Sequence, residues 1–458
     1  MDPLLTGDIG WGEVGIVLVK AGVAFGALLV AVILMVWFER KFIGDMQNRI
    51  GPNKAGPFGL LQTMADGLKL AFKEDLLPDR ADRFVFRLAP LLAVVPAFGT
   101  FAIIPIAGNF NGEGDGTVSM FGTTTFAQVA DPQFGILLML AFSGIAVYGV
   151  MLAGWSSGSK YPLLGSVRAT AQMVSYEAAL GLSIASVLLI SGQLSTNAIV
   201  DGQATFNWNL WVTGLVPFVV FLIAITAELN RPPFDFVEAE QELVGGFNTE
   251  YSSMRFAMFY LSEFMNTVTM SAIIVTLFFG GPAGPTFGLG GFLGTWLIPF
   301  LWFFAKLAVF LCVFVWFRAT LPRFRYDQLM ELGWKVMIPL ALGWFLVLAA
   351  VKVGQDQEWD LIVVIVGVTA ALMLGWMSVL AASRAAVVRR EGDHRALLAD
   401  VAVEPPPPPE PEPEPEPEPD DGDEAELATV GAPGLGDEVE GQTADGSASD
   451  GPAAEGDR

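Results

Sequence analysis

Four ionisable side chains lie inside long apolar runs, and they are the strongest candidates for chemistry in this chain. Three are the carboxylic acids Glu177, Glu228 and Glu263, and the fourth is the amine of Lys306. A charge at the centre of a membrane-spanning helix costs about 2.5–3.5 kcal/mol on insertion scales, so such groups normally face the bundle interior, water or one another. Groups held between burial and opposite charges can exchange protons near neutral pH. The alternatives are interhelical ion pairing without transport and, for Glu228, a position at the membrane interface.

A second group of acids follows Glu228 in the segment ITAELNRPPFDFVEAEQELVGG. The two prolines end the preceding helix, and Asp235 begins D-F-V-E, which is typical of a helix N-cap with a glutamate three residues on. In the short helix that follows, Glu238 and Glu242 are expected to share a face and Glu240 to point elsewhere. We expect Glu240 and Glu242 to line a polar cavity. For Glu238 the alternative role is completion of the capping box.

Long apolar runs are the elements that must position these acids. Each is about the 20 residues needed to cross roughly 30 Å of hydrocarbon. Only helices satisfy their own backbone polar groups in lipid without closing a barrel. The sequence therefore predicts an all-α, polytopic membrane protein. The predicted spans are 14–38, 84–107, 134–154, 172–192, 211–229, 256–279, 294–317, 334–353 and 361–382.

The distribution of Lys and Arg predicts the orientation of the chain. The loops after the first, third, fifth and seventh spans and the segment after the ninth contain Arg or Lys, whereas those after the second, fourth and sixth contain neither. Positive loops stay in the cytoplasm. We therefore expect the amino terminus outside, and the large loops and the tail in the cytoplasm.

Composition divides the chain into three parts. Residues 1–355 form the membrane domain, 356–400 hold an additional helix with a basic flank, and 401–458 are a Pro/Glu-rich acidic tail. This tail carries most of the net charge of −23. Because a Pro/Glu repeat cannot bury apolar surface, we expect the tail to be disordered.

Cysteine and histidine counts exclude several kinds of redox centre. Cys312 is the single cysteine, and the single histidine, His394, lies beyond the last span. These residues can supply neither an iron–sulfur cluster nor a pair of haem ligands. The sequence predicts no metal site and no nucleic-acid partner. Electrons for any redox reaction would come from another subunit.

The loop after the first span is long and chemically dense. Between residues 60 and 72, apolar side chains form one stripe of a helix suited to the membrane surface. Ahead of it, two Gly-Pro pairs predict turns. Such a helix beside basic residues is expected to frame an opening for a ligand that enters from the lipid. The alternative is a simple brace at the membrane surface.

Four blocks of sequence support a resemblance to a known family. They are ERKFIGDMQNRIGPNKAGPFGLLQTMADGLKLAFKED, SVRATAQMVSYEAALGL, AELNRPPFDFVEAEQELVGGFNTEYSSMRFAMFYLSEF and RATLPRFRYDQLMELGWK. In this order they closely resemble the H subunit of bacterial NADH-quinone oxidoreductase, the respiratory complex I, over about residues 10–355. The family is the membrane subunit that joins the proton-pumping arm to the peripheral arm and forms most of the quinone entry tunnel.

The resemblance implies roles for twelve residues, carried over by motif. The residues that resemble the quinone chamber and its acidic loop are Glu39, Arg40, Asp66, Arg168, Arg231 and Asp235. Those that resemble the proton relay into the membrane arm are Glu177, Glu228 and Glu263, together with Glu238, Glu240 and Glu242 of the loop.

The same resemblance implies the cofactors and partners. The subunit would bind no redox cofactor, its substrate would be a quinone (ubiquinone or menaquinone), and FMN and iron–sulfur clusters would lie in partner subunits. The expected partners are iron–sulfur and quinone-site peripheral subunits, adjacent small membrane subunits and the lipid bilayer of the bacterial plasma membrane.

Two departures leave alternatives open. The family usually has eight spans, so the ninth, 361–382, and the tail lie outside the resemblance. Related subunits also serve membrane-bound hydrogenases and cofactor-420 dehydrogenases. A stand-alone proton-coupled transporter predicts paired repeats, which this sequence lacks. A purely structural scaffold is the remaining alternative.

Overall fold

The computed structural model of the chain describes residues 2–5, 10–110, 115–236, 244–286, 291–357 and 367. Its long helices are α1 (Trp11–Met46), α3 (Arg83–Phe101), α4 (Gly135–Ser156), α5 (Lys160–Ser191), α8 (Leu215–Glu228), α10 (Ser253–Phe278), α11 (Ile298–Thr320) and α13 (Ile338–Asp356).

Seven helices in the described part of the chain are long and apolar enough to cross a membrane, and α8 is a shorter apolar helix. Each of the first eight predicted spans coincides with one of them, which confirms the all-α membrane class. The ninth predicted span, the acidic tail and the short helix expected after Asp235 lie outside the described residues.

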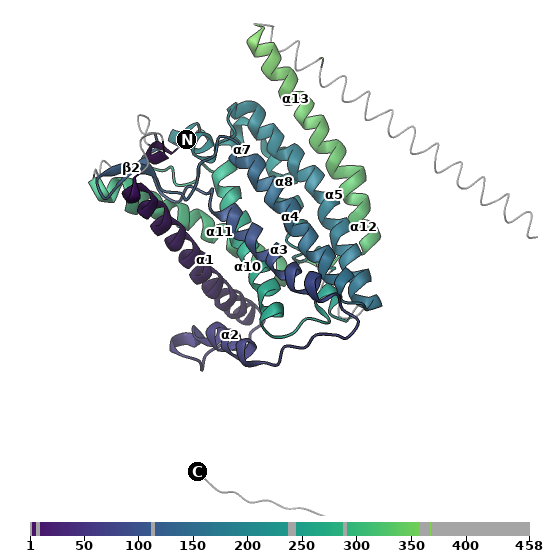
Figure 1. The fold of residues 1–458 in the computed structure, drawn as a ribbon. Helices are drawn as coiled ribbons and strands as arrows, with labels where there is room; N and C mark the ends of the chain where they lie inside the picture. The colour runs from purple at the N-terminus through teal and green to yellow at the C-terminus, as the bar shows by residue number, and fades with distance from the viewer. Residues whose placement is uncertain are drawn as a thin grey trace, which may run out of the picture. The chain divides into compact units, whose positions relative to one another are not determined.

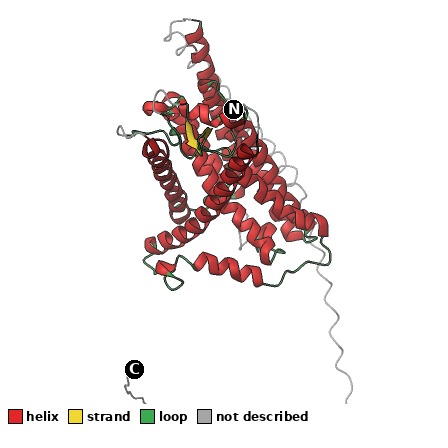
Figure 2. Ribbon diagram, turned by 60° about the vertical axis from the view of Figure 1, so that its left-hand side comes forward, coloured by secondary structure: helices red, strands yellow, loops and turns green. Residues whose placement is uncertain are grey.

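The shorter elements lie at the two ends of this bundle (Figure 1). At one end, α2 (Gln62–Phe72) follows α1. At the other are the amino terminus, α6 (Thr196–Asp201), α7 (Asn209–Val212) and a hairpin, visible in yellow in Figure 2. Its antiparallel strands β1 (Thr117–Met120) and β2 (Thr123–Phe126) pair Thr117 with Phe126. The remaining short elements are α12 (Tyr326–Glu331), the 3-10 turns Pro3–Leu5, Pro57–Gly59, Ala204–Phe206 and Gly246–Asn248, and π-helical turns at Leu293–Leu297 and Leu332–Met337.

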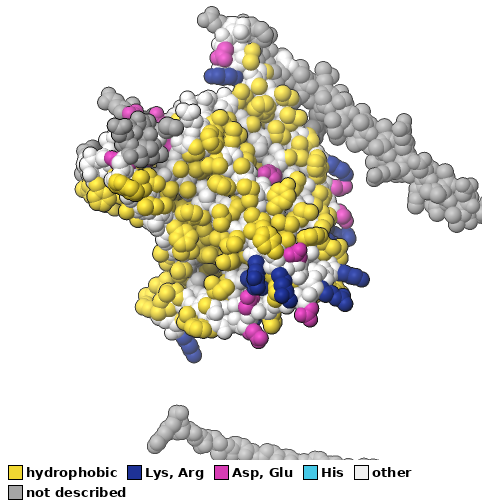
Figure 3. All heavy atoms as spheres, in the orientation of Figure 1, with side chains coloured by type: hydrophobic (Ala, Val, Ile, Leu, Met, Phe, Trp, Pro, Cys, Tyr) yellow, Lys and Arg dark blue, Asp and Glu magenta, His cyan; other side chains and the backbone are white. Residues whose placement is uncertain are grey.

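Helix α10 forms the centre of the bundle. Every residue from Thr267 to Phe278 is buried, whereas α1 and α13 leave most of their length uncovered. Apolar side chains dominate the uncovered surface, as Figure 3 shows, and Leu18 and Val23 of α1 are 67% and 65% exposed. Exposed apolar side chains of this kind suit contact with lipid.

Two helices extend well beyond the apolar runs that predicted them. Helix α5 begins at Lys160 rather than near residue 172, and α1 continues past Glu39 and Arg40 to Met46. Polar residues can continue a helix after it leaves the hydrocarbon, so hydropathy marks the lipid boundary and not the helix end. Consequently Glu177 lies in the middle of the helix α5, although it lies near the start of the apolar run.

Helices α4 and α5 approach very closely at Gly154. A Cβ atom at this position would lie 2.3 Å from the carbonyl oxygen of Pro162 and 2.2 Å from Oγ of Ser166. Only glycine fits at such a distance. This contact fixes the spacing of two helices that carry site residues.

Candidate functional site

Four charged side chains from four distant segments meet at the α2 end of the bundle. Arg231, just after α8, places Nη1 2.9 Å from Oε2 of Glu39 in α1 and Nε 3.1 Å from Oε1 of Glu263 in α10. Arg318, in the last turn of α11, donates a hydrogen bond to the other oxygen of Glu39. We call these four residues the charge cluster.

Burial makes the charge cluster energetically demanding. The side chains of Arg231 and Glu39 are 4% and 7% exposed. Burial disfavours the guanidinium charge, but Glu263 and Glu39 outweigh this effect and raise the pKa of Arg231 above its ordinary value. The guanidinium also lies 4.5 Å from the ring centre of Phe264, a cation–π distance. Arg231 therefore remains charged in the interior.

Arg231 still has donor capacity. Its contact with Glu263 has the distance of an ion pair but not the geometry of a hydrogen bond, and within the described residues neither Nε nor Nη2 has a hydrogen-bond acceptor. Buried donors normally find acceptors in protein, water or ligand. The arrangement can therefore accept a further polar group.

A second ion pair connects the first helix to α2. Nη1 of Arg40 lies 2.6 Å from Oδ2 of Asp66, and both side chains are about a third exposed, at 40% and 33%. Gln62 donates a further bond to Asp66, over 3.1 Å. Trp37 of α1 donates to the carbonyl of Phe58, over 2.9 Å. These contacts hold α2 beside the end of α1.

The amphipathic helix predicted for residues 60–72 is confirmed as α2. Its apolar stripe is uncovered, since Met64, Leu68 and Phe72 are 57%, 61% and 84% exposed. The turn ahead of it requires a glycine. Gly59 has a φ of +80°, and a Cβ there would lie 2.3 Å from the carbonyl oxygen of Pro52.

Glu228 is buried close to the charge cluster, shortly before Arg231 in the sequence. It is the last residue of α8 and accepts a hydrogen bond from Oγ of Ser143 in α4. Its second oxygen, Oε2, has no hydrogen-bond partner among the described residues. Its position at the helix end matches the sequence, and with 8% of the residue exposed it is a buried carboxylate and not a solvent-exposed one.

Two cavities meet at Glu228. One of about 70 Å³ is lined by both Glu228 and Glu263, and a smaller one of about 20 Å³ is lined by Glu228 and Ser143. Asn266 lines both. Because a water needs about 10–15 Å³ of such space and several polar partners, the larger cavity can hold water between the two acids. Glu228 and Glu263 thus line one cavity, whose walls are partly polar and partly apolar.

Glu177 faces the same region from α5. Its Oε1 lies 3.6 Å from the position that a Cβ on Gly144 would occupy, next to Ser143 in α4. The three predicted relay acids therefore lie on three helices, α5, α8 and α10, around one side of α4.

The other predicted site residues have different surroundings. Arg168 of α5 lies 5.5 Å from the ring centre of Tyr326 in α12. Asp235 is half-buried in the loop after Arg231. The three loop glutamates, Glu238, Glu240 and Glu242, lie outside the described residues.

Lys306 binds backbone at the opposite end of α10 from the charge cluster. Its ammonium donates to the carbonyl oxygens of Phe279, Gly281 and Ala283, over 2.8, 2.9 and 2.8 Å. A cation suits the carbonyl-rich C-terminus of a helix. These contacts favour the structural interpretation of Lys306.

Sequence reasoning missed several residues of the site. Arg318 served only as one of the positive residues that predict the orientation, and neither Ser143 nor Asn266 was identified as a site residue. Gln172 of α5 was also missed. Its Nε2 donates to the carbonyls of Ala227 and Phe234, over 2.7 and 2.8 Å, and so supports the segment around Arg231. Their common signal is a polar side chain within an apolar helix.

Comparisons with known proteins identify the family of this chain. A family model described as NADH dehydrogenase matches residues 19–349. A relative from Frankia alni, named as the H subunit of NADH-quinone oxidoreductase, is 48% identical over 383 residues, which cover 83% of this chain and 82% of the relative. A relative of the same name from Streptomyces avermitilis is 48% identical over 351 residues, 75% of each chain. Another, from Frankia casuarinae, is 49% identical over 347 residues, 75% of this chain and 74% of the relative.

The family match covers the charge cluster, α2 and the buried acids. The chain belongs to the NADH dehydrogenase family, and the relatives it matches are H subunits of NADH-quinone oxidoreductase.

Proposed function

We propose that this chain is a membrane subunit of an NADH-quinone oxidoreductase, in which the charge cluster and the Arg40–Asp66 pair face the quinone headgroup. The proposal rests on the buried Arg231. Two carboxylates stabilise its positive charge, and its Nε and Nη2 donate no hydrogen bond to any described residue. A quinone is an amphiphile with two carbonyl oxygens that accept hydrogen bonds. Its headgroup therefore matches a buried, donor-bearing site.

The route to this site begins at α2. The uncovered apolar stripe of Met64, Leu68 and Phe72 suits the membrane surface. The Arg40–Asp66 pair lies between this helix and α1, next in sequence to Glu39 of the charge cluster. A quinone that leaves the lipid beside α2 would pass this pair before it reaches Arg231.

The relay acids supply the second half of the function. Reduction of a quinone to a quinol takes up two electrons and two protons, which changes the charge that the site must balance. Glu263 contacts Arg231 and also lines the cavity that leads to Glu228. A proton displaced at the charge cluster can pass through water in that cavity to Glu228, and Glu177 lies beyond Ser143. We propose that these three acids begin the proton path.

Redox chemistry and partners follow from the family. Electrons would reach the quinone from an iron–sulfur cluster of a peripheral partner subunit, supplied in turn by FMN in another. The positive loops support an orientation with the α2 end in the cytoplasm and the amino terminus outside the bacterial plasma membrane. The relatives' names favour the NADH enzyme over a membrane-bound hydrogenase, a cofactor-420 dehydrogenase or a stand-alone transporter.

The test is purification of the complex through a tag on this chain, with Glu39→Gln as the variant. This change leaves Arg231 with one carboxylate and Arg318 with none in the charge cluster. Glu331→Gln is the matched control, because Glu331 pairs with Lys335 on the surface at 64% exposure. We measure inhibitor-sensitive NADH:quinone activity, NADH oxidation with a water-soluble acceptor, and the partner subunits in the eluate.

We expect wild type and the control to recover flavin and iron–sulfur subunits and full quinone reduction. Glu39→Gln should retain oxidation with the soluble acceptor but lose about tenfold or more of its quinone activity, equivalent to at least about 1.4 kcal/mol of transition-state stabilisation. Normal quinone kinetics in this variant would contradict the assignment of the charge cluster. Recovery of hydrogenase subunits, or of a lone chain, would contradict the NADH enzyme.

A further inference from the structure

A large apolar pocket lies at the opposite end of the bundle from the charge cluster. It has a volume of about 350 Å³ and is bounded by α1, the end of α3, the segment after β2 and the start of α11. Ala24 and Ala27 of α1, Ile104 after α3 and Trp296 before α11 are among its lining residues. We call it the outer pocket. Volumes of 300–1,000 Å³ with mostly apolar walls are typical of ligand sites.

One polar side chain in the lining has no partner. Gln128 is 4% exposed, and neither its Nε2 nor its Oε1 forms a hydrogen bond with any described residue. A buried amide without partners is costly and rare. Since Gln128 lines the outer pocket, the missing donor and acceptor can be supplied from inside it.

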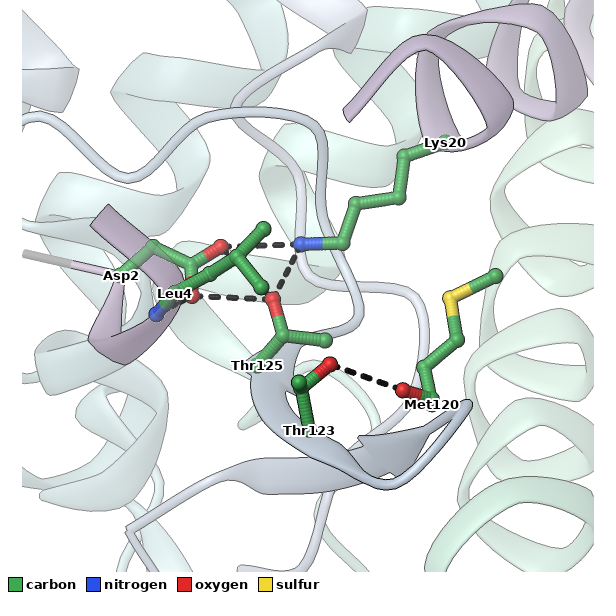
Figure 4. A network of polar contacts seen from close by, with 6 residues as sticks. All are labelled: Asp2, Leu4, Lys20, Met120, Thr123 and Thr125. Carbon is green, nitrogen blue, oxygen red and sulfur yellow. Dashed lines mark hydrogen bonds and ion pairs between the residues drawn. The ribbon is translucent and has the colours of Figure 1, made fainter. Parts of the chain in front are cut away.

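Figure 4 shows a polar network around Lys20, which is one of the residues that line the outer pocket. The Lys20 ammonium, from α1, lies 2.8 Å from Oδ2 of Asp2 and also donates to Oγ1 of Thr125 in β2. Thr125 is 2.9 Å from both Asp2 oxygens. Asp2 balances the charge of Lys20, so the wall carries no net charge. An ammonium has three N–H donors. In the described part of the chain, two oxygen atoms accept hydrogen bonds from the Lys20 ammonium.

The mouth of the outer pocket opens sideways between α1 and the start of α11. Three lining residues at this edge, Val23, Phe292 and Phe300, are 65%, 70% and 44% exposed. They belong to the uncovered apolar surface of helices that span the membrane, so an occupant enters from the lipid rather than from water.

We propose that the outer pocket binds a glycerophospholipid whose headgroup carries an N–H or O–H donor. One acyl chain would fill the apolar walls between α1 and α11. The ester or phosphate oxygens would accept from Nε2 of Gln128 and from Lys20, and the headgroup donor would bond to Oε1 of Gln128. Phosphatidylethanolamine offers this combination, whereas phosphatidylcholine has no donor. The neutral wall agrees with a zwitterionic headgroup.

The test uses the purified complex in bilayer nanodiscs with a phosphatidylethanolamine probe that carries a photoreactive group in one acyl chain. After illumination, cross-linked peptides are mapped by mass spectrometry. Ala27→Phe fills the mouth from an exposed position, and Val30→Phe is the control on the same helix, because Val30 is 55% exposed and outside the lining. We expect cross-links to residues 20–27 and 292–300 in wild type and Val30→Phe, and only background in Ala27→Phe.

Competition with unlabelled lipid tests the role of Gln128. In wild type, phosphatidylethanolamine should compete about fivefold better than phosphatidylcholine, because the bond from the headgroup donor to Oε1 of Gln128, which contributes about 1 kcal/mol, is the one bond that phosphatidylcholine cannot form. Gln128→Leu keeps the volume and should abolish this preference. Equal competition by both lipids in wild type would overturn the proposal, and so would cross-links that persist in Ala27→Phe. The absence of cross-links in wild type would show that another subunit or a segment of this chain covers the outer pocket. This result would also overturn the proposal.

Discussion

Replacing Lys306 by methionine separates a structural role for this lysine from a role in proton transfer. The side chain keeps a similar length, but the three bonds to the carbonyls of Phe279, Gly281 and Ala283 are lost. Hydrogen bonds from a charged donor contribute about 1.5–3 kcal/mol each. Removal of a charge from the membrane interior returns about 2.5–3.5 kcal/mol. The difference predicts a net destabilisation of about 3 kcal/mol.

Membrane complexes usually unfold irreversibly, so the assay measures the rate of thermal inactivation at one temperature. A loss of about 3 kcal/mol, expressed mostly in the unfolding step, raises this rate by about tenfold to a hundredfold. Initial NADH:quinone turnover of freshly purified Lys306→Met should stay within about twofold of wild type, because no member of the relay has changed.

Lys352→Met is the matched control. Lys352 lies in α13 and forms no hydrogen bond with any described residue, so its replacement should change neither rate. Loss of turnover in Lys306→Met with unchanged thermal inactivation would refute the structural interpretation and return Lys306 to the proton path.

Three further changes test other contacts. Ser143→Ala removes the only hydrogen bond that Glu228 accepts from a described residue. The complex should still assemble, but proton-coupled turnover should slow about tenfold, which corresponds to about 1.4 kcal/mol. Unchanged proton pumping in proteoliposomes would contradict this prediction. Gly154→Ala should block assembly of the complex, because the added Cβ would clash with α5. Gly181→Ala is the control, since a Cβ there would have no neighbouring atom within 4 Å, and this variant should assemble normally in blue-native gels. Tyr176→Phe loses one buried bond to an α12 carbonyl, so thermal inactivation should quicken by about fivefold, and an unchanged rate would count against that bond.

The sequence predicted elements that depend on local pattern. The span positions followed from apolar length, and α2 followed from its single stripe, since both signals lie within one segment. Helix ends were less accessible, as α5 shows, because hydropathy does not report where a helix continues in water. The sequence could not predict whether Glu228 is buried, because a helix end can lie at the membrane interface or inside the bundle.

The partners of each charge could not be predicted from pattern alone. Glu39 and Arg231 are 192 residues apart, and Glu39 and Arg318 are 279 apart. Nothing local specifies such pairs, because they depend on how four helices pack at one end. The same limit applies to Lys306, whose position in an apolar run suited proton transfer until the carbonyls of the α10 terminus were placed beside it.

The contacts at both ends of α10 indicate where movement can occur. Its last half is buried on all sides, and Lys306 fixes the carbonyls that follow it. Its first half carries Glu263, which contacts Arg231. Arg231 follows α8 and does not belong to α10, and α1 is largely uncovered. We therefore predict that Arg231, the end of α1 and α2 adjust to a change of charge at the proposed quinone site, while α10 keeps Glu263 beside the cavity that Glu228 also lines.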